Sequence, residues 1–194
     1  MPKLGMEPIR RDALVNATIA EIGAAGSLDV TVSRIAKRAG MSSALAHHYF
    51  GGKEQIFLAA MRRILTDFGA EVRAELATAV PDQRAAAIIR ASFAQSCFAP
   101  EKISAWMTFY VMAQNNPQAL RLWRIYQRRM RSNLSHALRP LVADAAADAA
   151  VLAALIDGLY LRSALHDPET SQIATRQALA VLDMLLHAKA RPVQ

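Results

Sequence analysis

Residues 31–50, TVSRIAKRAGMSSALAHHYF, predict two short helices joined by a tight turn. Thr31 can cap the first helix, because its hydroxyl can accept a hydrogen bond from a free backbone N–H of the first turn. Gly40 can adopt the left-handed backbone conformation that ends a helix in a tight turn. Ser42 or Ser43 can then cap the second helix. Two short helices joined by a three-residue turn that contains glycine form the helix-turn-helix pattern.

The outer face of the second helix predicts a contact with DNA. In helix-turn-helix proteins this helix lies in the major groove, where its first residues meet base edges while neighbouring groups hold phosphates. The residues on that outer face are Ser43, Ala44 and His47. The first helix opens with free N–H groups that favour a phosphate, at Thr31, Ser33 and Arg34. On spacing alone, the alternative is a helical hairpin that only packs and whose polar residues are solvated.

Composition and charge agree with a helical, DNA-binding chain. Hydrophobic residues make up 53% and charged residues 20% of 194 residues, alanine and leucine are frequent, and glycine is sparse. The formal net charge of +7 and a pI near 10.1 favour a polyanionic partner. Positive charge is denser in residues 1–65 than in the rest of the chain.

The sequence predicts a soluble, cytoplasmic protein that does not contact a membrane. Its single cysteine, Cys97, suits a reducing compartment. No apolar segment follows the basic residues near the N-terminus, as a secretory signal would require. The longest uncharged apolar stretch, 149–156, is far shorter than the roughly 20 residues that span a membrane.

Proline and glycine divide the chain into about nine helical segments, so the expected fold class is all-α. The fourth segment carries an apolar residue every three or four positions, and it is long enough to connect two modules. The expected segments are 9–25, 31–39, 43–49, 53–80, 82–98, 101–114, 118–138, 144–166 and 169–188.

Two motifs around the predicted helix-turn-helix carry a family resemblance. Residues 31–42 fit T-x-x-x-I-A-x-x-A-G-M-S, and residues 48–54 fit H-Y-F-x-x-K-E. Together they resemble the signature of the TetR family of repressors, which implies phosphate contacts from Thr31 and Lys53. This chain has Ala44 where the family often has glycine and His47 where it usually has tyrosine, so His47 could reach a base instead of a phosphate. The predicted DNA-binding residues are Thr31, Ser33, Arg34, Ser42, Ser43, Ala44, His47, His48, Tyr49 and Lys53.

Four further segments lie at both ends and in the middle of the chain: PKLGMEPIRRDALVNATI at 2–19, WMTFY at 106–110, RRMRSNL at 128–134 and IDGLYLR at 156–162. They resemble the choline-sensing, BetI-type repressors. This resemblance implies choline as the effector and control of genes that convert choline to glycine betaine. The alternative is a TetR-type repressor that responds to a different small hydrophobic or cationic ligand.

The C-terminal part contains most of the aromatic residues, which suits a quaternary ammonium ligand, because each aromatic face attracts such a cation by about 0.5–2 kcal/mol. The segment 101–114 places three of them on one helix face. Taken alone, each fits a packed core better, and the resemblance makes the two interpretations equal for those three. Asp157 interrupts an apolar run, where it can oppose a ligand cation or pair with an arginine, and we favour the pair. The predicted ligand-binding residues are Trp106, Phe109, Tyr110, Trp123, Tyr126, Asp157 and Tyr160.

The last three predicted helices suggest surfaces for other molecules. The seventh carries five arginines, four of which recur at three- or four-residue spacing and form a basic stripe: Arg121, Arg124, Arg128, Arg129 and Arg131. This stripe suits a second DNA surface less well than a solvated face or salt bridges between subunits. The eighth is apolar nearly all round, so two of its sides must be covered. We expect one side to face the symmetry mate of a homodimer, together with three leucines of the ninth: Leu179, Leu182 and Leu186.

No catalytic pattern is present, so we expect no enzyme activity, no cofactor and no metal site. The chain lacks a G-x-S-x-G elbow, a P-loop, a dinucleotide fingerprint and a helical H-x-x-x-H pair. A DNA-binding protein indifferent to sequence would leave the aromatic half without a role. The sequence therefore predicts a dimeric, effector-responsive repressor whose partners are an operator in double-stranded DNA and a small molecule, with choline suspected. Its expected domains are a helix-turn-helix domain at 1–52 and a ligand-sensing and dimerisation domain at 53–194.

Overall fold

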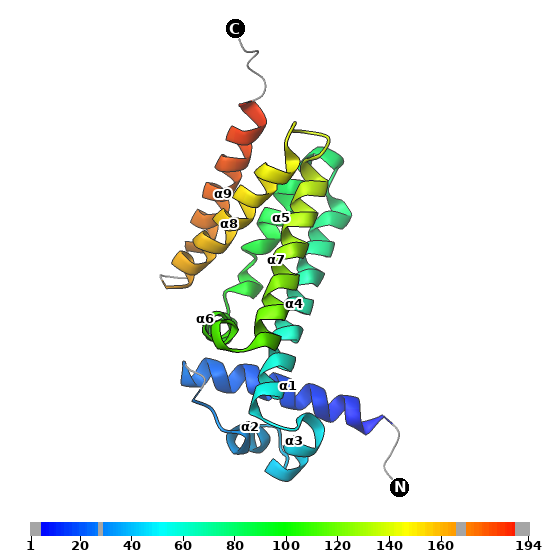
Figure 1. Cartoon of the computed structure of the whole chain (residues 1–194), viewed down its shortest axis with the longest axis vertical. Helices are drawn as coiled ribbons and strands as arrows, with labels where there is room; N and C mark the ends of the chain where they lie inside the picture. Colours follow the sequence, from blue (N-terminus) through cyan, green and yellow to red (C-terminus); the bar gives the residue numbers. More distant parts are fainter. Residues whose placement is uncertain (1–4, 27–28, 166–169, 189–194) are drawn as a thin grey trace. The chain divides into compact units, whose positions relative to one another are not determined.

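The structure, a computed structural model, describes residues 5–26, 29–165 and 170–188 (Figure 1). Over these residues it contains α-helices and two short 3₁₀ helices, and no strand, which confirms the predicted all-α class. The α-helices are α1 Met6–Ala25, α2 Val32–Arg38, α3 Ser43–Phe50, α4 Lys53–Thr78, α5 Arg84–Ser92, α6 Pro100–Asn115, α7 Pro117–Leu138, α8 Ala145–Ala164 and α9 Thr170–His187. The predicted break at 167–168 lies outside the described residues.

The segment 82–98 does not form the single helix that its apolar spacing predicts. It contains α5 between two 3₁₀ helices, η1 Pro81–Gln83 and η2 Gln95–Cys97, and Ala94 adopts extended angles of φ −57° and ψ 142°. Neither proline nor glycine marks this break in the sequence. The backbone carbonyl of Cys97 instead accepts a hydrogen bond from the Tyr160 hydroxyl at 3.0 Å, so a residue of α8 holds the interrupted segment.

The chain divides into two compact units whose members are not contiguous in sequence. The first unit comprises residues 1–66 and 99–122, and the second comprises 67–98 and 123–194. The helix α6 therefore belongs with the helix-turn-helix, and α4 and α7 each contribute to both units. The functional boundary predicted between residues 52 and 53 stays a prediction.

Small residues allow close packing in the first unit, where α1 contacts both α2 and α6. Leu14, Ile35 and Phe109 are fully buried in its core. Gly23 on α1 lies so close to α6 that a Cβ atom built there would stand 2.4 Å from Cβ of Glu101 and 2.5 Å from its Cα. Only glycine fits this contact without a shift of one helix.

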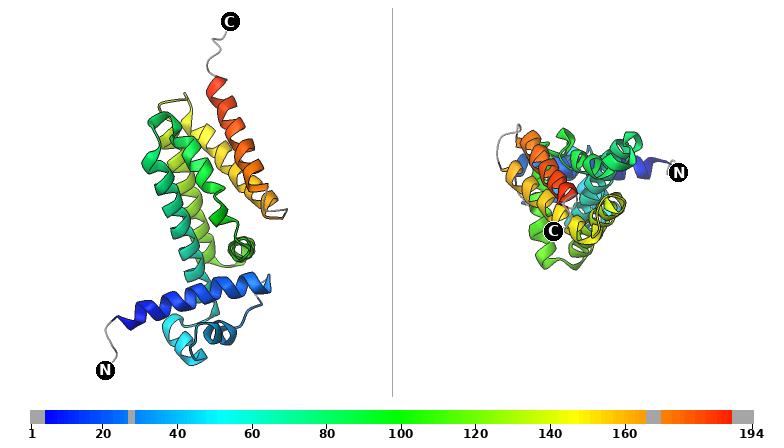
Figure 2. Two further views of the ribbon diagram at one scale, coloured as in Figure 1. Left: turned by 180° about the vertical axis from the view of Figure 1, so that it is seen from behind. Right: turned by 90° about the horizontal axis from the view of Figure 1, so that it is seen from above.

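The second unit packs α9 against both α5 and α8 (Figure 2). Its core consists of fully buried aliphatic side chains, Ile88, Ile89, Leu134, Leu138 and Leu152. Alanines at 149, 153, 174 and 178 are buried as well, and their small size lets α8 and α9 approach each other. No helix in the described ranges is long and apolar enough to cross a membrane.

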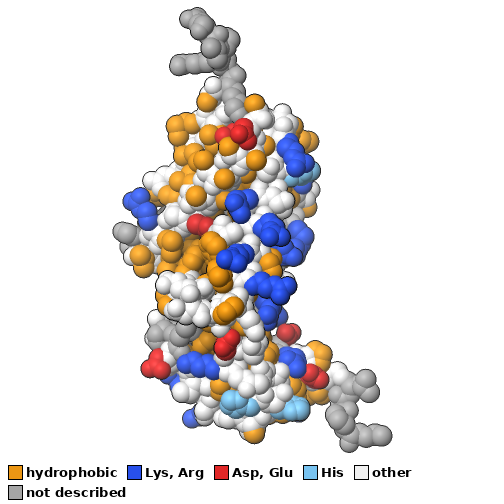
Figure 3. All heavy atoms as spheres, viewed as in Figure 1, with side chains coloured by type: hydrophobic (Ala, Val, Ile, Leu, Met, Phe, Trp, Pro, Cys, Tyr) orange, Lys and Arg blue, Asp and Glu red, His pale blue; other side chains and the backbone are white. Residues whose placement is uncertain are grey.

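Both α8 and α9 carry an exposed apolar face (Figure 3). The large exposed apolar side chains in this part of the chain are Val151 on α8, Leu165 directly after it, and Ile173 and Met184 on α9. The prediction that Leu182 faces a symmetry mate is wrong, because this residue is only 3% exposed and belongs to the core of its own chain. Leu179 and Leu186 are half-buried. The 3.6-residue period showed that α9 has apolar residues at helical spacing. It could not show which of them pack inside the same unit and which stay exposed.

Candidate DNA-binding and effector sites

The helix-turn-helix is built by local hydrogen bonds. The Thr31 hydroxyl accepts from the backbone N–H of Arg34 at 3.2 Å and caps α2. The Ser42 hydroxyl accepts from the backbone N–H of Leu45 at 3.2 Å, so Ser42 rather than Ser43 caps α3. Between them Gly40 has φ +67°, and the N–H of Met41 donates to the carbonyl of Ala36 at 2.8 Å. This is a Schellman turn, and glycine provides its left-handed position.

The second helix of the motif, α3, buries Ala46 and leaves the predicted reading positions accessible. Ala44, His47 and His48 are exposed, as is Ser42 at the cap, while Ser43 and Tyr49 are half-buried. The residues predicted to hold phosphates, Thr31, Ser33, Arg34 and Lys53, are exposed too. The predicted inner residue Leu45 is only half-buried, and Ala46 takes its place in the core. Each predicted DNA-binding residue therefore has at least part of its surface free.

Two arginines of α1, which are not among the predicted DNA-binding residues, join this surface. Nη1 of Arg10 donates to the Tyr49 hydroxyl at 3.4 Å. The guanidinium of Arg11 lies 5.6 Å from the ring centroid of Tyr49 and 5.1 Å from that of Phe50, within the range of a cation–π contact. The adjacent pair of arginines was visible in the sequence, but its place beside α3 depends on how α1 packs.

A buried ion pair connects α1 with α2. The carboxylate of Glu21 is almost fully buried, and it accepts a hydrogen bond from Nε of Arg38. Nη2 of Arg34 lies 2.9 Å from its second oxygen. The hydrogen bond from Arg38 lowers the pKa of Glu21, and although burial opposes that effect, the nearby charge of Arg34 adds to it. Arg34, predicted to bind phosphate, thus already has a partner within the protein.

The predicted effector residues are divided between the two compact units. Trp106, Phe109 and Tyr110 lie on one face of α6, in the first unit, and the ring centroid of Trp106 is 5.8 Å from each of the other two. Trp106 and Phe109 are buried, and Tyr110 is half-buried. The sequence spacing that predicted a shared face is therefore confirmed, while the role of these residues in ligand binding stays a prediction.

The other predicted effector residues lie in the second unit. Asp157 accepts hydrogen bonds from Nε2 of Gln127 and, at 3.1 Å, from the hydroxyl of Tyr126. Its partners are thus these two neutral side chains rather than the predicted arginine. Burial raises the pKa of Asp157, and the hydrogen bonds from Gln127 and Tyr126 oppose that rise. Tyr160, on the same helix as Asp157, has its ring centroid 5.0 Å from that of Phe98.

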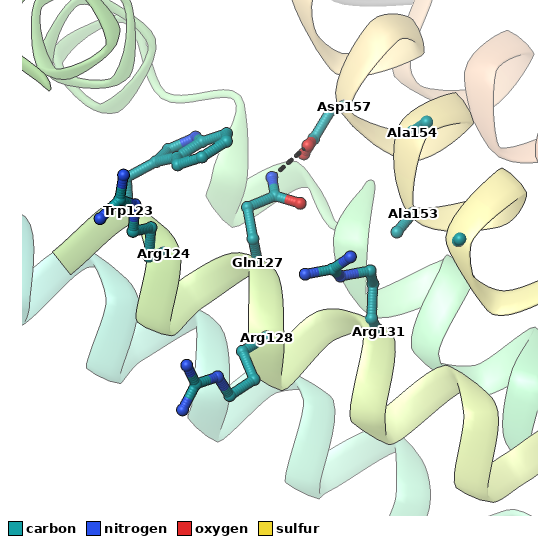
Figure 4. A pocket seen from close by; sticks show the side chains of 9 residues that line it. Trp123, Arg124, Gln127, Arg128, Arg131, Ala153, Ala154 and Asp157 are labelled. Atoms are coloured by element: carbon teal, nitrogen blue, oxygen red, sulfur yellow. Dashed lines mark hydrogen bonds between the residues drawn. The ribbon is translucent and has the colours of Figure 1, made fainter. Parts of the chain in front are cut away.

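A groove of about 490 Å³ lies between α7 and α8, within the second unit (Figure 4). Its α7 wall consists of Trp123, Arg124, Gln127, Arg128 and Arg131, and its α8 wall of Ala150, Ala153, Ala154 and Asp157. Two predicted effector residues, Trp123 and Asp157, thus line one groove. The three arginines belong to the basic stripe predicted from the sequence, and the part played by Gln127 was missed.

A capped helix-turn-helix with an exposed second helix, joined to a larger set of helices, defines a DNA-binding regulator. Comparisons with known proteins agree. A profile of bacterial regulatory proteins of the TetR family matches residues 14–60. A profile of the C-terminal part of BetI-type transcriptional repressors matches residues 81–188.

Individual relatives agree with these profiles. The HTH-type transcriptional regulator BetI of Brucella suis is 52% identical over 168 residues, which cover 85% of each chain. That of Rhizobium meliloti is 46% identical over 194 residues, 98% of this chain and 94% of the other. A protein of Saccharomonospora viridis, crystallised in complex with choline, superposes with a TM-score of 0.74 at 21% identity. The match covers 89% of this chain and 95% of that protein. The chain belongs to the TetR family of transcriptional regulators, among the BetI-type repressors. The relatives are DNA-binding regulators and not enzymes, as the sequence predicted.

Proposed function

We propose that this repressor binds its operator as a homodimer and releases it when choline binds, so that it controls genes for the conversion of choline to glycine betaine. The observation that carries the DNA-binding part is the exposure of Ala44 and His47 on a helix held by the Ser42 cap and the Gly40 turn. These residues would reach base edges, while Thr31 and Lys53 would hold phosphates. A cytoplasmic location follows from binding of a bacterial operator.

The exposed apolar faces of α8 and α9 support the homodimer. Val151, Ile173 and Met184 are large apolar side chains, and their removal from water by a second copy would lower the free energy of the pair. A twofold pair of such helices buries both faces at once. The dimer would present two recognition helices about 34–36 Å apart, which matches one turn of DNA and a pseudo-palindromic operator.

Choline as the effector is supported by the BetI-type relatives and by the aromatic cluster of α6. A quaternary ammonium ion has no N–H to donate, so aromatic faces are well suited to hold it. We propose that Trp106, Phe109 and Tyr110 provide them. Both α4 and α7 contribute to the two units, and α4 also follows the helix-turn-helix directly in the chain, so we expect α4 to transmit the effect of the ligand.

Operator titrations with and without choline test this proposal. Choline should lower the operator affinity of the wild type by about 5–150-fold, and operator DNA should weaken choline binding by the same factor. Trp106→Ala should abolish the choline response, whereas operator binding by the free protein should stay near that of the wild type. Val111→Ala, which changes an exposed residue of α6 outside the aromatic cluster, serves as the control and should retain the response.

The outcomes separate the parts of the proposal. A choline response that survives in Trp106→Ala would remove this residue from the effector site. If choline binds neither protein while the operator is bound normally, the effector is a different small hydrophobic or cationic molecule. Failure to bind any operator would contradict the proposal as a whole.

A further inference from the structure

The groove between α7 and α8 carries an excess of positive charge on one wall. Arg124, Arg128 and Arg131 line it, and all three are exposed. Among the described residues, none of the three has an ion-pair partner in its own chain. Figure 3 shows a row of Lys and Arg side chains along the face that α7 presents. Guanidinium groups without a partner are suited to bind a carboxylate or a phosphate, often through two parallel hydrogen bonds.

The opposite wall carries one negative group at a fixed position. Asp157 is half-buried on α8, and its two oxygens accept hydrogen bonds from Gln127 and Tyr126. In the described part of the chain no arginine or lysine lies within ion-pair distance of this carboxylate. The arginines and the aspartate thus line the same groove without neutralising one another (Figure 4).

The groove also has the size and the apolar surface that a small molecule requires. Its volume of about 490 Å³ lies within the range of about 300–1,000 Å³ that is typical of ligand sites. The Trp123 indole contributes an aromatic surface, and Ala150, Ala153 and Ala154 make the α8 wall apolar beside Asp157. An indole face attracts a cation in addition to its apolar contact.

We infer that this groove binds a small zwitterion, with its anionic group among Arg124, Arg128 and Arg131 and its cationic group between Asp157 and Trp123. A plain cation such as choline would leave the three guanidinium groups unpaired and would be repelled by them. A plain anion would leave Asp157 without compensation. Because burial disfavours the ionised form of Asp157, a ligand cation beside it would stabilise the carboxylate.

This site goes beyond the proposed choline response, since it lies in the second unit and takes a different class of ligand from the α6 cluster. Three probes separate the alternatives. Glycine betaine carries a trimethylammonium group and a carboxylate, choline carries the same cation with a hydroxyl in place of the carboxylate, and acetate carries only the anion. Calorimetry with the full-length protein at one ionic strength, about 0.1 M, measures all three under equal screening.

We expect glycine betaine to bind at least tenfold more tightly in this groove than choline or acetate. Arg131→Gln should weaken glycine betaine binding at least tenfold, and Asp157→Asn should do the same while it keeps an oxygen that can accept from Tyr126. Arg129→Gln is the matched control, because Arg129 is an exposed arginine of the same helix that does not line the groove. It should leave the affinity within about twofold of the wild type.

The inference is overturned if glycine betaine binds no more tightly than acetate, which would indicate a simple anion site. It is also overturned if glycine betaine binds no more tightly than choline in Trp106→Ala, where the proposed α6 site is removed. Equal losses in Arg129→Gln and Arg131→Gln would also overturn it, since they would indicate a general charge effect. Circular dichroism and thermal unfolding verify that each variant is folded. Operator release by choline, measured on the same proteins, tests the proposed function separately, because that response depends on Trp106 and not on Arg131.

Discussion

Replacing Gly23 by alanine tests how closely α1 and α6 pack in the first unit. Alanine is the better helix former, so at an open helical position this change stabilises a protein by up to about 1 kcal/mol. At Gly23, however, the new Cβ would stand 2.4 Å from Cβ of Glu101 and 2.5 Å from its Cα. Carbon atoms in contact lie about 3.5–4.0 Å apart, so the two helices must separate by about 1 Å.

The cost of this separation should exceed the gain in helix propensity. Overpacking in a rigid contact costs about 1–3 kcal/mol, so we expect a net loss of about 1–2 kcal/mol. In a chain of this length each kcal/mol corresponds to about 2–4 °C, and Tm should fall by about 2–8 °C. Thermal unfolding of wild type and variant at one protomer concentration measures the difference, since association would otherwise change Tm.

Gly69→Ala provides the matched control on α4. The nearest atom to its added Cβ is Nη1 of Arg73 at 3.4 Å, the end of a flexible side chain, so nothing rigid opposes the substitution. This variant should be more stable than the wild type by about 0.5–1 kcal/mol. A Gly23→Ala protein that unfolds at or above the wild-type Tm would refute the packing argument.

Three further predictions concern other contacts. The pKa of Glu21 is lowered in the fold, so its contribution to stability is present above the unfolded value of 4.5 and is lost as the pH falls through the folded value. The Tm of Glu21→Gln should therefore fall less on acidification than that of the wild type. An equal fall of Tm with pH in both proteins would contradict this. Leu182→Ala leaves a cavity in the core and should destabilise the protomer by about 2–5 kcal/mol. Met184→Arg changes a side chain that is 61% exposed, so it should weaken only the dimer, as measured by sedimentation. The reverse pattern would contradict the assignment of the two faces. Lys53→Ala should weaken binding to all DNA sequences alike and reduce the salt slope by about one unit, so an unchanged slope in operator titrations would exclude Lys53 from phosphate contact.

The helix-turn-helix was predictable from sequence because short-range interactions determine it. The capping hydroxyls of Thr31 and Ser42 bond to N–H groups three residues away, and the turn at Gly40 closes within α2 itself. Caps, a left-handed glycine and a periodic apolar face are all properties of a segment of about twenty residues. The spacing of Trp106, Phe109 and Tyr110 likewise determines that they share a face of α6.

Tertiary packing decided the features that depend on distant partners. The break after Ser92 is held by Tyr160, which lies 63 residues beyond Cys97 in the chain. Leu182 and Met184 are both apolar, and only the packing of α5 and α8 on α9 determines that the first is buried and the second exposed. Asp157 was visible as a polar residue in an apolar run, but its partners come from α7. A sequence records which side chains can form a contact, and the fold determines which of them approach closely enough to form it.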